Sequence, residues 1–73
     1  MANPPLGQLY RHYKGGLYRF LFEVTHTENH EPMVVYVAVE PPHPRWVRPR
    51  SMFFENVDVP GYGVVPRFTP IEE

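Results

Sequence analysis

The clearest structural signal in the chain is the alternating segment Tyr18-Arg19-Phe20-Leu21-Phe22-Glu23-Val24. Side chains of a β-strand point to opposite faces in turn, so alternation of this kind indicates a strand with one buried face. The apolar face holds Tyr18, Phe20, Phe22 and Val24, and the opposite face holds both charges. The segment therefore predicts a strand over residues 18–24 whose aromatic face belongs to the core.

The sequence on either side predicts partner strands. The turn Lys14-Gly15-Gly16 precedes the segment, and its glycines can supply the positive φ of a tight hairpin, which predicts a strand over residues 8–13. A polar break at residues 27–30 follows the segment and leads into Met-Val-Val-Tyr-Val-Ala-Val at residues 33–39. This run is apolar on both faces, which is typical of an interior strand covered on both sides.

The C-terminal half predicts shorter elements. The proline-rich segment 41–44 predicts a loop, because proline cannot donate a ladder hydrogen bond. Residues 45–48 predict a short fourth strand, and residues 49–55 a single helical turn capped by Ser51. A fifth strand at residues 57–59, a turn at 60–63 and an extended piece at 64–68 complete the chain.

Length and composition bound the architecture. A chain of 73 residues with ten prolines, five glycines and no cysteine has room for one small domain, at 1–73, that closes on packing and strand pairing alone. We expect a mostly β fold: a small SH3-like barrel or a strongly bent antiparallel sheet of about five strands with one short helical turn. The ends, 1–6 and 69–73, are expected to fray. The expected core comprises Tyr18, Phe20, Phe22, Val35, Val37 and Val47.

Two features bear on cellular location. The N-terminal residues show no basic region followed by an apolar run, so we expect no secretory signal and a cytoplasmic protein. The longest apolar run, residues 33–39, is far shorter than the roughly 20 residues that cross a bilayer as a helix, so we expect no membrane association. The sequence leaves the oligomeric state open.

Metal binding and catalysis are the weaker functional hypotheses. The histidines His12, His26, His30 and His43 lack the spacing of a known metal site, so we expect no metal and no cofactor. General acid–base chemistry would depend on His12 or His26 with Glu28, and the chain has no glycine-flanked nucleophile. We therefore expect no catalytic residues, with a small enzyme kept as an alternative.

The stronger hypothesis is a basic and aromatic binding surface. Its candidate residues are Arg48, Trp46, Arg50, Tyr13 and His12. Arginine supplies planar, multidentate donors and aromatic faces stack on planar ligands, so the expected partner is a protein or peptide, or a small anionic or aromatic ligand. Alternation places Trp46 and Arg48 on one face of the fourth strand. A purely structural interpretation places the aromatic residues in the core and pairs the arginines with Glu23, Glu28, Glu31 or Glu40.

Two alternative partners remain. Nucleic acid is less favoured, because the net charge of −1 and pI near 6.4 argue against affinity by phosphate neutralisation. A peptide groove formed by Tyr10, Tyr13, Tyr36, Trp46 and Phe53 is also open.

Several motifs together resemble one bacterial family. They are Tyr10-Arg11-His12-Tyr13-Lys14-Gly15-Gly16, His26-Thr27-Glu28, Val35-Tyr36, Trp46-Val47-Arg48-Pro49, Met52-Phe53-Phe54-Glu55 and Arg67-Phe68. Over residues 7–68 the chain resembles the family known as domain of unknown function 1653. The resemblance implies a free-standing small bacterial domain without an assigned activity, and it transfers no catalytic residue. The prolines of residues 41–44 depart from the glycine- or aspartate-containing turn associated with that family.

Overall fold

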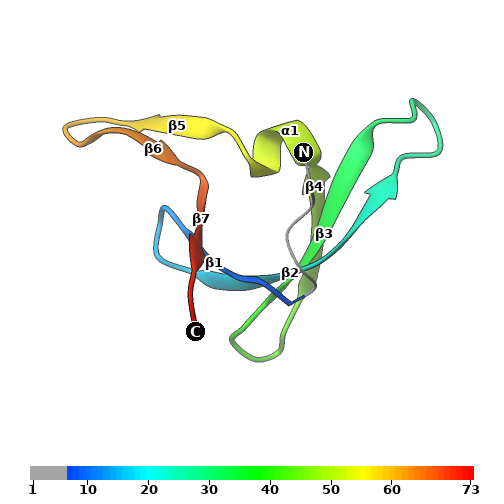
Figure 1. The fold of residues 1–73 in the computed structure, drawn as a ribbon, viewed down its shortest axis with the longest axis horizontal. Coiled ribbons are helices and arrows are strands. Elements are labelled where there is room, and N and C mark those ends of the chain that lie inside the picture. Colours follow the sequence, from blue (N-terminus) through cyan, green and yellow to red (C-terminus); the bar gives the residue numbers. More distant parts are fainter. Residues whose placement is uncertain (1–6) are drawn as a thin grey trace.

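A computed structural model describes residues 7–73 of the chain; the expected frayed segment 1–6 lies outside them. Within this part the elements follow one another along the chain as Figure 1 shows. They are β1 (Leu9–His12), β2 (Leu17–Thr25), β3 (Pro32–Ala38), β4 (Arg45–Pro49), α1 (Arg50–Phe53), β5 (Asn56–Val59), β6 (Gly63–Pro66) and β7 (Phe68–Ile71).

The strands form a bent antiparallel sheet and a separate hairpin. The larger sheet has the order β4-β3-β2-β1-β7, and β5 pairs with β6. In Figure 1 the sheet curves from β4 and β3 through β2 and β1 to β7, while α1 and the β5–β6 hairpin lie across its open side. The mostly β prediction is confirmed in its bent-sheet form. The closed-barrel alternative is not what the described residues form, because β4 and β7 remain edge strands.

The β1–β2 turn uses its two glycines for different reasons. Gly15 has a φ of 107°, a value that L side chains rarely adopt, and its N–H donates to the carbonyl of His12. Gly16 does not have positive φ; a Cβ there would lie 3.0 Å from the Tyr18 ring. The prediction that both glycines supply positive φ therefore holds for Gly15 alone.

A bulge in β2 changes which side chains reach the core. Phe20 lies opposite Tyr36, but Phe22 lies opposite Val35, so the register shifts between the two phenylalanines. An extra residue in one strand reverses the alternation of everything beyond it. Phe20 is consequently 3% exposed while Phe22 is 51% exposed. The prediction that Phe22 and Val24 share the core face with Phe20 is wrong for this reason.

The core lies on the concave face of the sheet, under α1. It is built from Tyr10, Phe20, Val34, Tyr36, Phe53 and Phe68, with Tyr18 packed against it. The fully buried Phe53 of α1 stacks on Phe68, with ring centroids 4.2 Å apart. Because α1 covers this face, Val34 and Tyr36 of β3 are buried, whereas the predicted core residues Val35 and Val37 are half-buried on the other face.

Two further predictions about β4 and α1 need correction. Val47 was expected in the core, but it alternates with Trp46 and Arg48 onto the uncovered face, where it is 57% exposed. Ser51 was expected to cap the helical turn, yet it lies inside α1, whose N-cap is Pro49 without a side-chain hydrogen bond. A proline at that position ends β4 and already has the φ at which a helix can begin.

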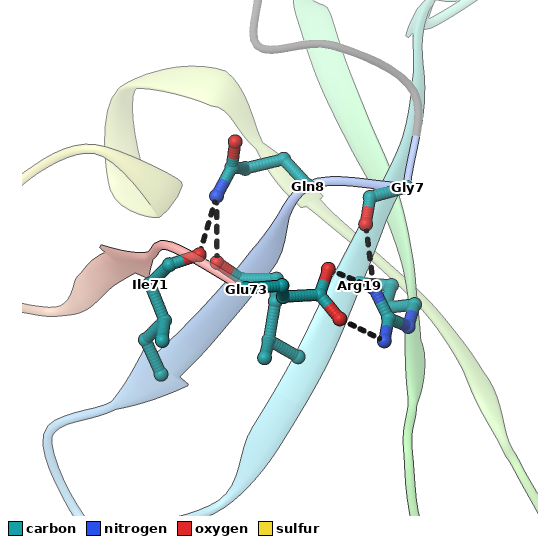
Figure 2. Close-up of polar contacts among 6 residues, drawn as sticks. Gly7, Gln8, Arg19, Ile71 and Glu73 are labelled. Atoms are coloured by element: carbon teal, nitrogen blue, oxygen red, sulfur yellow. Dashed lines mark hydrogen bonds and ion pairs between the residues drawn. The ribbon is translucent and has the colours of Figure 1, made fainter.

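The C-terminal segment, expected to fray over residues 69–73, forms a strand as far as Ile71. The extended piece expected at residues 64–68 divides at Arg67, whose N–H donates to the Glu55 carbonyl and whose carbonyl accepts from Tyr13. Beyond this point residues 69–71 pair with β1. Figure 2 shows the last contact, in which Arg19 donates two hydrogen bonds of 2.8 Å to Glu73.

Gln8 and Arg19 join the start of the described chain to its end. The Gln8 side chain donates to the carbonyl of Ile71 at 3.1 Å, and Arg19 also donates to the Gly7 carbonyl at 2.9 Å (Figure 2). The hydrogen bonds from Arg19 hold the pKa of the Glu73 carboxyl below its ordinary value. In residues 7–73 no helix has both the length and the apolar character that spanning a membrane would need.

Candidate functional site

The concave face of the sheet is hollowed beside the core. This aromatic cavity, of about 200 Å³, is lined by His12, Tyr18, Tyr36, Trp46, Arg48 and Phe68. Every strand of the larger sheet contributes to it: β1, β2, β3 and β7 give one residue each, and β4 gives two. The cavity therefore depends on the whole bent sheet and not on a single loop.

Strand alternation puts Trp46 and Arg48 into this cavity. Both side chains point to the concave face, and Trp46 lies opposite Tyr36 in the ladder. Trp46 is 50% exposed, so half of its surface stays open to solvent or to a ligand. A half-exposed indole beside other rings is a suitable stacking surface for a planar group.

Arg48 is held in place by neutral groups. Its Nε donates to the Tyr36 hydroxyl at 3.2 Å, and its guanidinium carbon lies 5.8 Å from the centroid of the Phe68 ring. No ion pair within residues 7–73 involves Arg48. The nitrogen atoms at the end of its guanidinium group are thus free to form a two-point contact with a carboxylate or phosphate.

Three other arginines of the molecule provide a contrast. Arg19 pairs with Glu73, and Arg67 pairs with Glu55. Arg50, a predicted ligand contact, pairs with Glu23 at 2.8 Å and lies 4.9 Å from the Phe54 ring centroid. It lines neither of the cavities described here.

His12 forms the wall of the aromatic cavity on the β1 side. Its ring centroid lies 5.0 Å from that of Phe68 and 4.6 Å from that of Tyr13. Its Nδ1 atom accepts the backbone N–H of Lys14 at 3.1 Å, which leaves the proton of the neutral ring on Nε2. Nε2–H is therefore available as a donor.

The electrostatic environment of His12 is positive. Partial burial lowers the pKa of His12, and the charges of Arg48, Arg67 and Lys14 lower it further. No residue that lines the aromatic cavity is acidic. An anion in this place would be attracted by the same charges that oppose protonation of the imidazole.

A second hollow adjoins the first. This hairpin cavity, of about 320 Å³, lies between β1 and the β5–β6 hairpin. Its walls include Arg11, His12, Tyr13, Val59, Tyr62 and Val65. The predicted residue Tyr13 lies here and not with Trp46 and Arg48, and His12 lines both cavities.

The remaining histidines lie in two loops, one of which, between β3 and β4, holds His43. His26 and His30 belong to the β2–β3 turn, where the Nδ1 of His26 accepts the backbone N–H of Glu28 at 3.1 Å. In Figure 1 this turn lies at the right of the molecule, and the β1–β2 turn, which follows His12, lies toward the left. Among the residues that the structure describes, no three histidine, aspartate or glutamate side chains gather closely enough to hold a metal ion.

Sequence reasoning missed part of the cavity lining. Tyr18 was assigned to the core and Phe68 was not assigned a role, although both line the aromatic cavity. The alternation of residues 18–24 already gave Tyr18 the concave face, but Phe68 is brought there only by the pairing of β7 with β1. Tyr10 and Phe53 do not contribute to the alternative peptide groove, because both are buried in the core.

Comparisons with known proteins give a family but no activity. The family described as Protein of unknown function (DUF1653) matches residues 8–70. A crystal structure of a DUF1653 protein from Bordetella bronchiseptica is 34% identical, with a TM-score of 0.78 over 89% of this chain and 85% of that one. No curated protein matches. With nearly its whole length matched in sequence and in structure, the chain belongs to the DUF1653 family.

Proposed function

We propose that this domain is a non-catalytic binding module whose aromatic cavity takes a planar group that carries a negative charge. The observation that carries the proposal is the state of Arg48. Its guanidinium is oriented by the Tyr36 hydroxyl and the Phe68 ring, without a carboxylate partner in residues 7–73. An arginine held in this way is prepared to bind an anion, since less rotamer freedom is lost on binding.

The rest of the lining suits the aromatic part of such a ligand. Trp46 offers a half-exposed ring and Tyr18 a partly buried one, while the buried rings of Tyr36 and Phe68 line the cavity from the core. The volume of about 200 Å³ is below the range of roughly 300–1,000 Å³ that is usual for small-molecule sites. The cavity therefore suits a single ring or side chain better than a large cofactor.

Charge supports an anion in preference to a cation. Aromatic cavities also bind ammonium groups, but Arg48 lies inside this one, and Arg67 and Lys14 act on His12 with the same sign. A cationic ligand would face repulsion without a carboxylate in the lining to offset it. A ligand that combines a ring with a carboxylate or phosphate satisfies both the rings and Arg48.

The proposal can be tested with phenyl phosphate as the probe and phenol as its neutral counterpart. The chain has one tryptophan, so the indole N–H of Trp46 gives a single assignable signal in a ¹H–¹⁵N spectrum. Phenyl phosphate should shift this signal and the backbone amides of β4 and of the β1–β2 turn in a saturable way. Phenol should do so only weakly, because it lacks the partner for Arg48.

Two arginines of β4 provide matched variants. Arg48→Gln should weaken phenyl phosphate binding by roughly 10- to 100-fold, the equivalent of the 1.5–3 kcal/mol usual for a hydrogen bond to a charged group. Arg45→Gln removes the same charge from the uncovered face and should leave the affinity nearly unchanged. Arg48→Lys, which keeps the charge but loses the planar fork, should give an intermediate affinity.

The controls make the outcome decisive. Each variant is first checked for cooperative unfolding, so that loss of binding is separated from loss of fold. Equal effects of the Arg45 and Arg48 substitutions would mean that the probe responds to general surface charge, and the proposed site would be abandoned. Saturable shifts confined to the β2–β3 turn would lead to the same conclusion.

A further inference from the structure

Strand β4 lies at the edge of the larger sheet and is paired on one side only. Its ladder with β3 sets Val37 opposite Arg45. One position beyond that pair, the Ala38 N–H donates to the Pro44 carbonyl at 3.0 Å, so these two facing residues form a hydrogen-bonded pair. Hydrogen-bonded and non-hydrogen-bonded pairs alternate along an antiparallel ladder. Arg45 and Val47 therefore belong to non-hydrogen-bonded pairs, and their N–H and C=O groups point away from β3.

These outward groups have no partner in the part of the chain that the structure describes. No backbone or side-chain hydrogen bond within residues 7–73 reaches the N–H or C=O of Arg45 or Val47. The side chains of this strand are open as well, because Trp46 is 50% and Val47 57% exposed. The edge thus presents two donors and two acceptors in the arrangement that an added strand requires.

The charges on β4 are all of one sign. Arg45 lies on the uncovered face and Arg48 on the concave face, and no ion pair within residues 7–73 involves either of them. The strand contains no acidic residue. A second copy of β4 would bring two more arginines to this edge, and like charges at an edge oppose pairing between copies. A strand that carries carboxylates would instead meet an opposite charge on each face.

We propose that the free edge of β4 is a docking site for an extended acidic peptide segment, which adds to the sheet as an antiparallel strand. The peptide backbone bonds to Arg45 and Val47, and two carboxylates three residues apart lie opposite Arg45 and Arg48. A step of three residues along a strand reverses the face, as it does between these two arginines. Strand addition to a sheet edge is a common mode of peptide recognition. The inference goes beyond the proposed function, because it concerns the backbone of β4 and needs no ligand in the aromatic cavity.

The probe is the heptapeptide Thr-Glu-Val-Thr-Glu-Val-Thr, acetylated and amidated at its ends, whose two glutamates are three residues apart. Its binding is followed by ¹H–¹⁵N amide shifts and by hydrogen exchange at the amides of Arg45 and Val47. Because these amides are unpaired in the free protein, saturating probe should slow their exchange on the order of tenfold. A version with lysine in place of both glutamates should bind roughly tenfold more weakly, since it faces the arginines with like charge.

Methylation of alternate peptide nitrogens tests strand addition itself. In an added strand, every second residue directs its N–H toward β4. With the glutamates opposite Arg48 and Arg45, these are the third and fifth residues of the probe. Methylation of those two nitrogens should abolish binding, whereas methylation of the second and fourth should change the affinity by no more than about threefold.

Two variants at one position provide the matched test on the protein side. Val47→Pro removes an outward N–H that makes no bond to β3, and edge strands accept proline where the N–H faces solvent. This variant should lose binding of the probe. Val47→Ala trims the same exposed side chain but keeps the N–H, so its affinity should stay within about threefold of the wild type. Cooperative unfolding is checked first, and if the proline variant does not fold, the methylated probes decide the question.

The outcomes separate this inference from the proposed function. Equal binding of the two methylated probes, equal binding of the glutamate and lysine probes, or no binding of the reference probe at about 1 mM would each overturn the inference. Phenyl phosphate binding that depends on Arg48 would leave the proposed function standing in those cases. If the reference probe obeys the methylation pattern but phenyl phosphate does not bind, the inference stands and the proposed function fails. A dimer that forms without peptide and is dissociated by Val47→Pro, measured by analytical ultracentrifugation, would assign this edge to a second copy and overturn the peptide.

Discussion

The bulge in β2 can be tested by a pair of identical substitutions on one strand. Phe20 and Phe22 are two positions apart, so simple alternation would give them the same environment. The register shift between them instead leaves Phe20 3% exposed and Phe22 51% exposed. Replacing each by alanine, one at a time, therefore compares a buried with a half-exposed ring of the same type.

The structure gives the expected size of the difference. Phe20→Ala removes a buried ring that contacts Phe53 edge-on, with centroids 6.4 Å apart, and should lower the free energy of unfolding by about 3–5 kcal/mol. Phe22→Ala loses about half of the 1.5–3 kcal/mol that full burial of such a side chain provides and leaves no closed cavity, so it should cost about 1 kcal/mol. A domain of this size has a stability of about 5 kcal/mol, and the Phe20 variant should therefore be largely unfolded.

The assay is urea denaturation followed by far-UV circular dichroism and by the fluorescence of the single tryptophan. The wild-type protein and the Phe22 variant should unfold cooperatively with similar slopes, because they expose similar surface on unfolding. If Phe22→Ala destabilises as strongly as Phe20→Ala, the two rings share a face, and the bulge with its reversed alternation is refuted. A near-native Phe20 variant would refute the placement of the core.

Three further predictions concern pH, the first turn and the C-terminal contact. The pKa of His12 is lower in the folded state than its ordinary 6.5. The stability that the neutral His12 ring contributes is therefore present above about pH 6.5 and is lost as the pH falls through the folded-state pKa. His12→Gln should reduce the fall in the unfolding midpoint between about pH 7 and pH 5. Gly15→Ala should cost about 1–2 kcal/mol in urea denaturation through its positive φ, since nothing lies within 4 Å of the added Cβ; an unchanged midpoint would contradict the turn geometry. Glu73→Gln should leave the thermal midpoint in 0.15 M salt almost unchanged, because the pair with Arg19 is exposed and screened; a large shift would show that this contact holds β7 in place.

Local sequence was sufficient for most of the strands and for part of the candidate site. Alternation located β2, and the β-branched run located β3, because the two-residue period is a property of the strand itself. The same period correctly placed Trp46 and Arg48 on one face of β4. Glycine and proline marked the β1–β2 turn and the loop before β4, because their backbone restrictions act within a few residues.

Sequence could not determine which face of each strand is covered. The core face of β3 holds Val34 and Tyr36 because α1 places Phe53 over that side of the sheet, and nothing within residues 33–39 distinguishes the two faces. The β2 bulge has the same origin: its extra residue is visible only against the register of β3. Both depend on contacts between segments distant in sequence.

For the candidate site, too, the sequence determined one part and the tertiary structure the other. The amino-acid types alone determined that Arg48 and Arg50 can bind anions and that Trp46 can stack. Only the tertiary structure decided that Arg50 is paired with Glu23, while Arg48 joins His12 and Phe68 in one cavity. The physical reason is that the chemistry of a side chain is set by its own atoms, whereas its availability depends on the charges and rings that folding brings within a few ångströms of it.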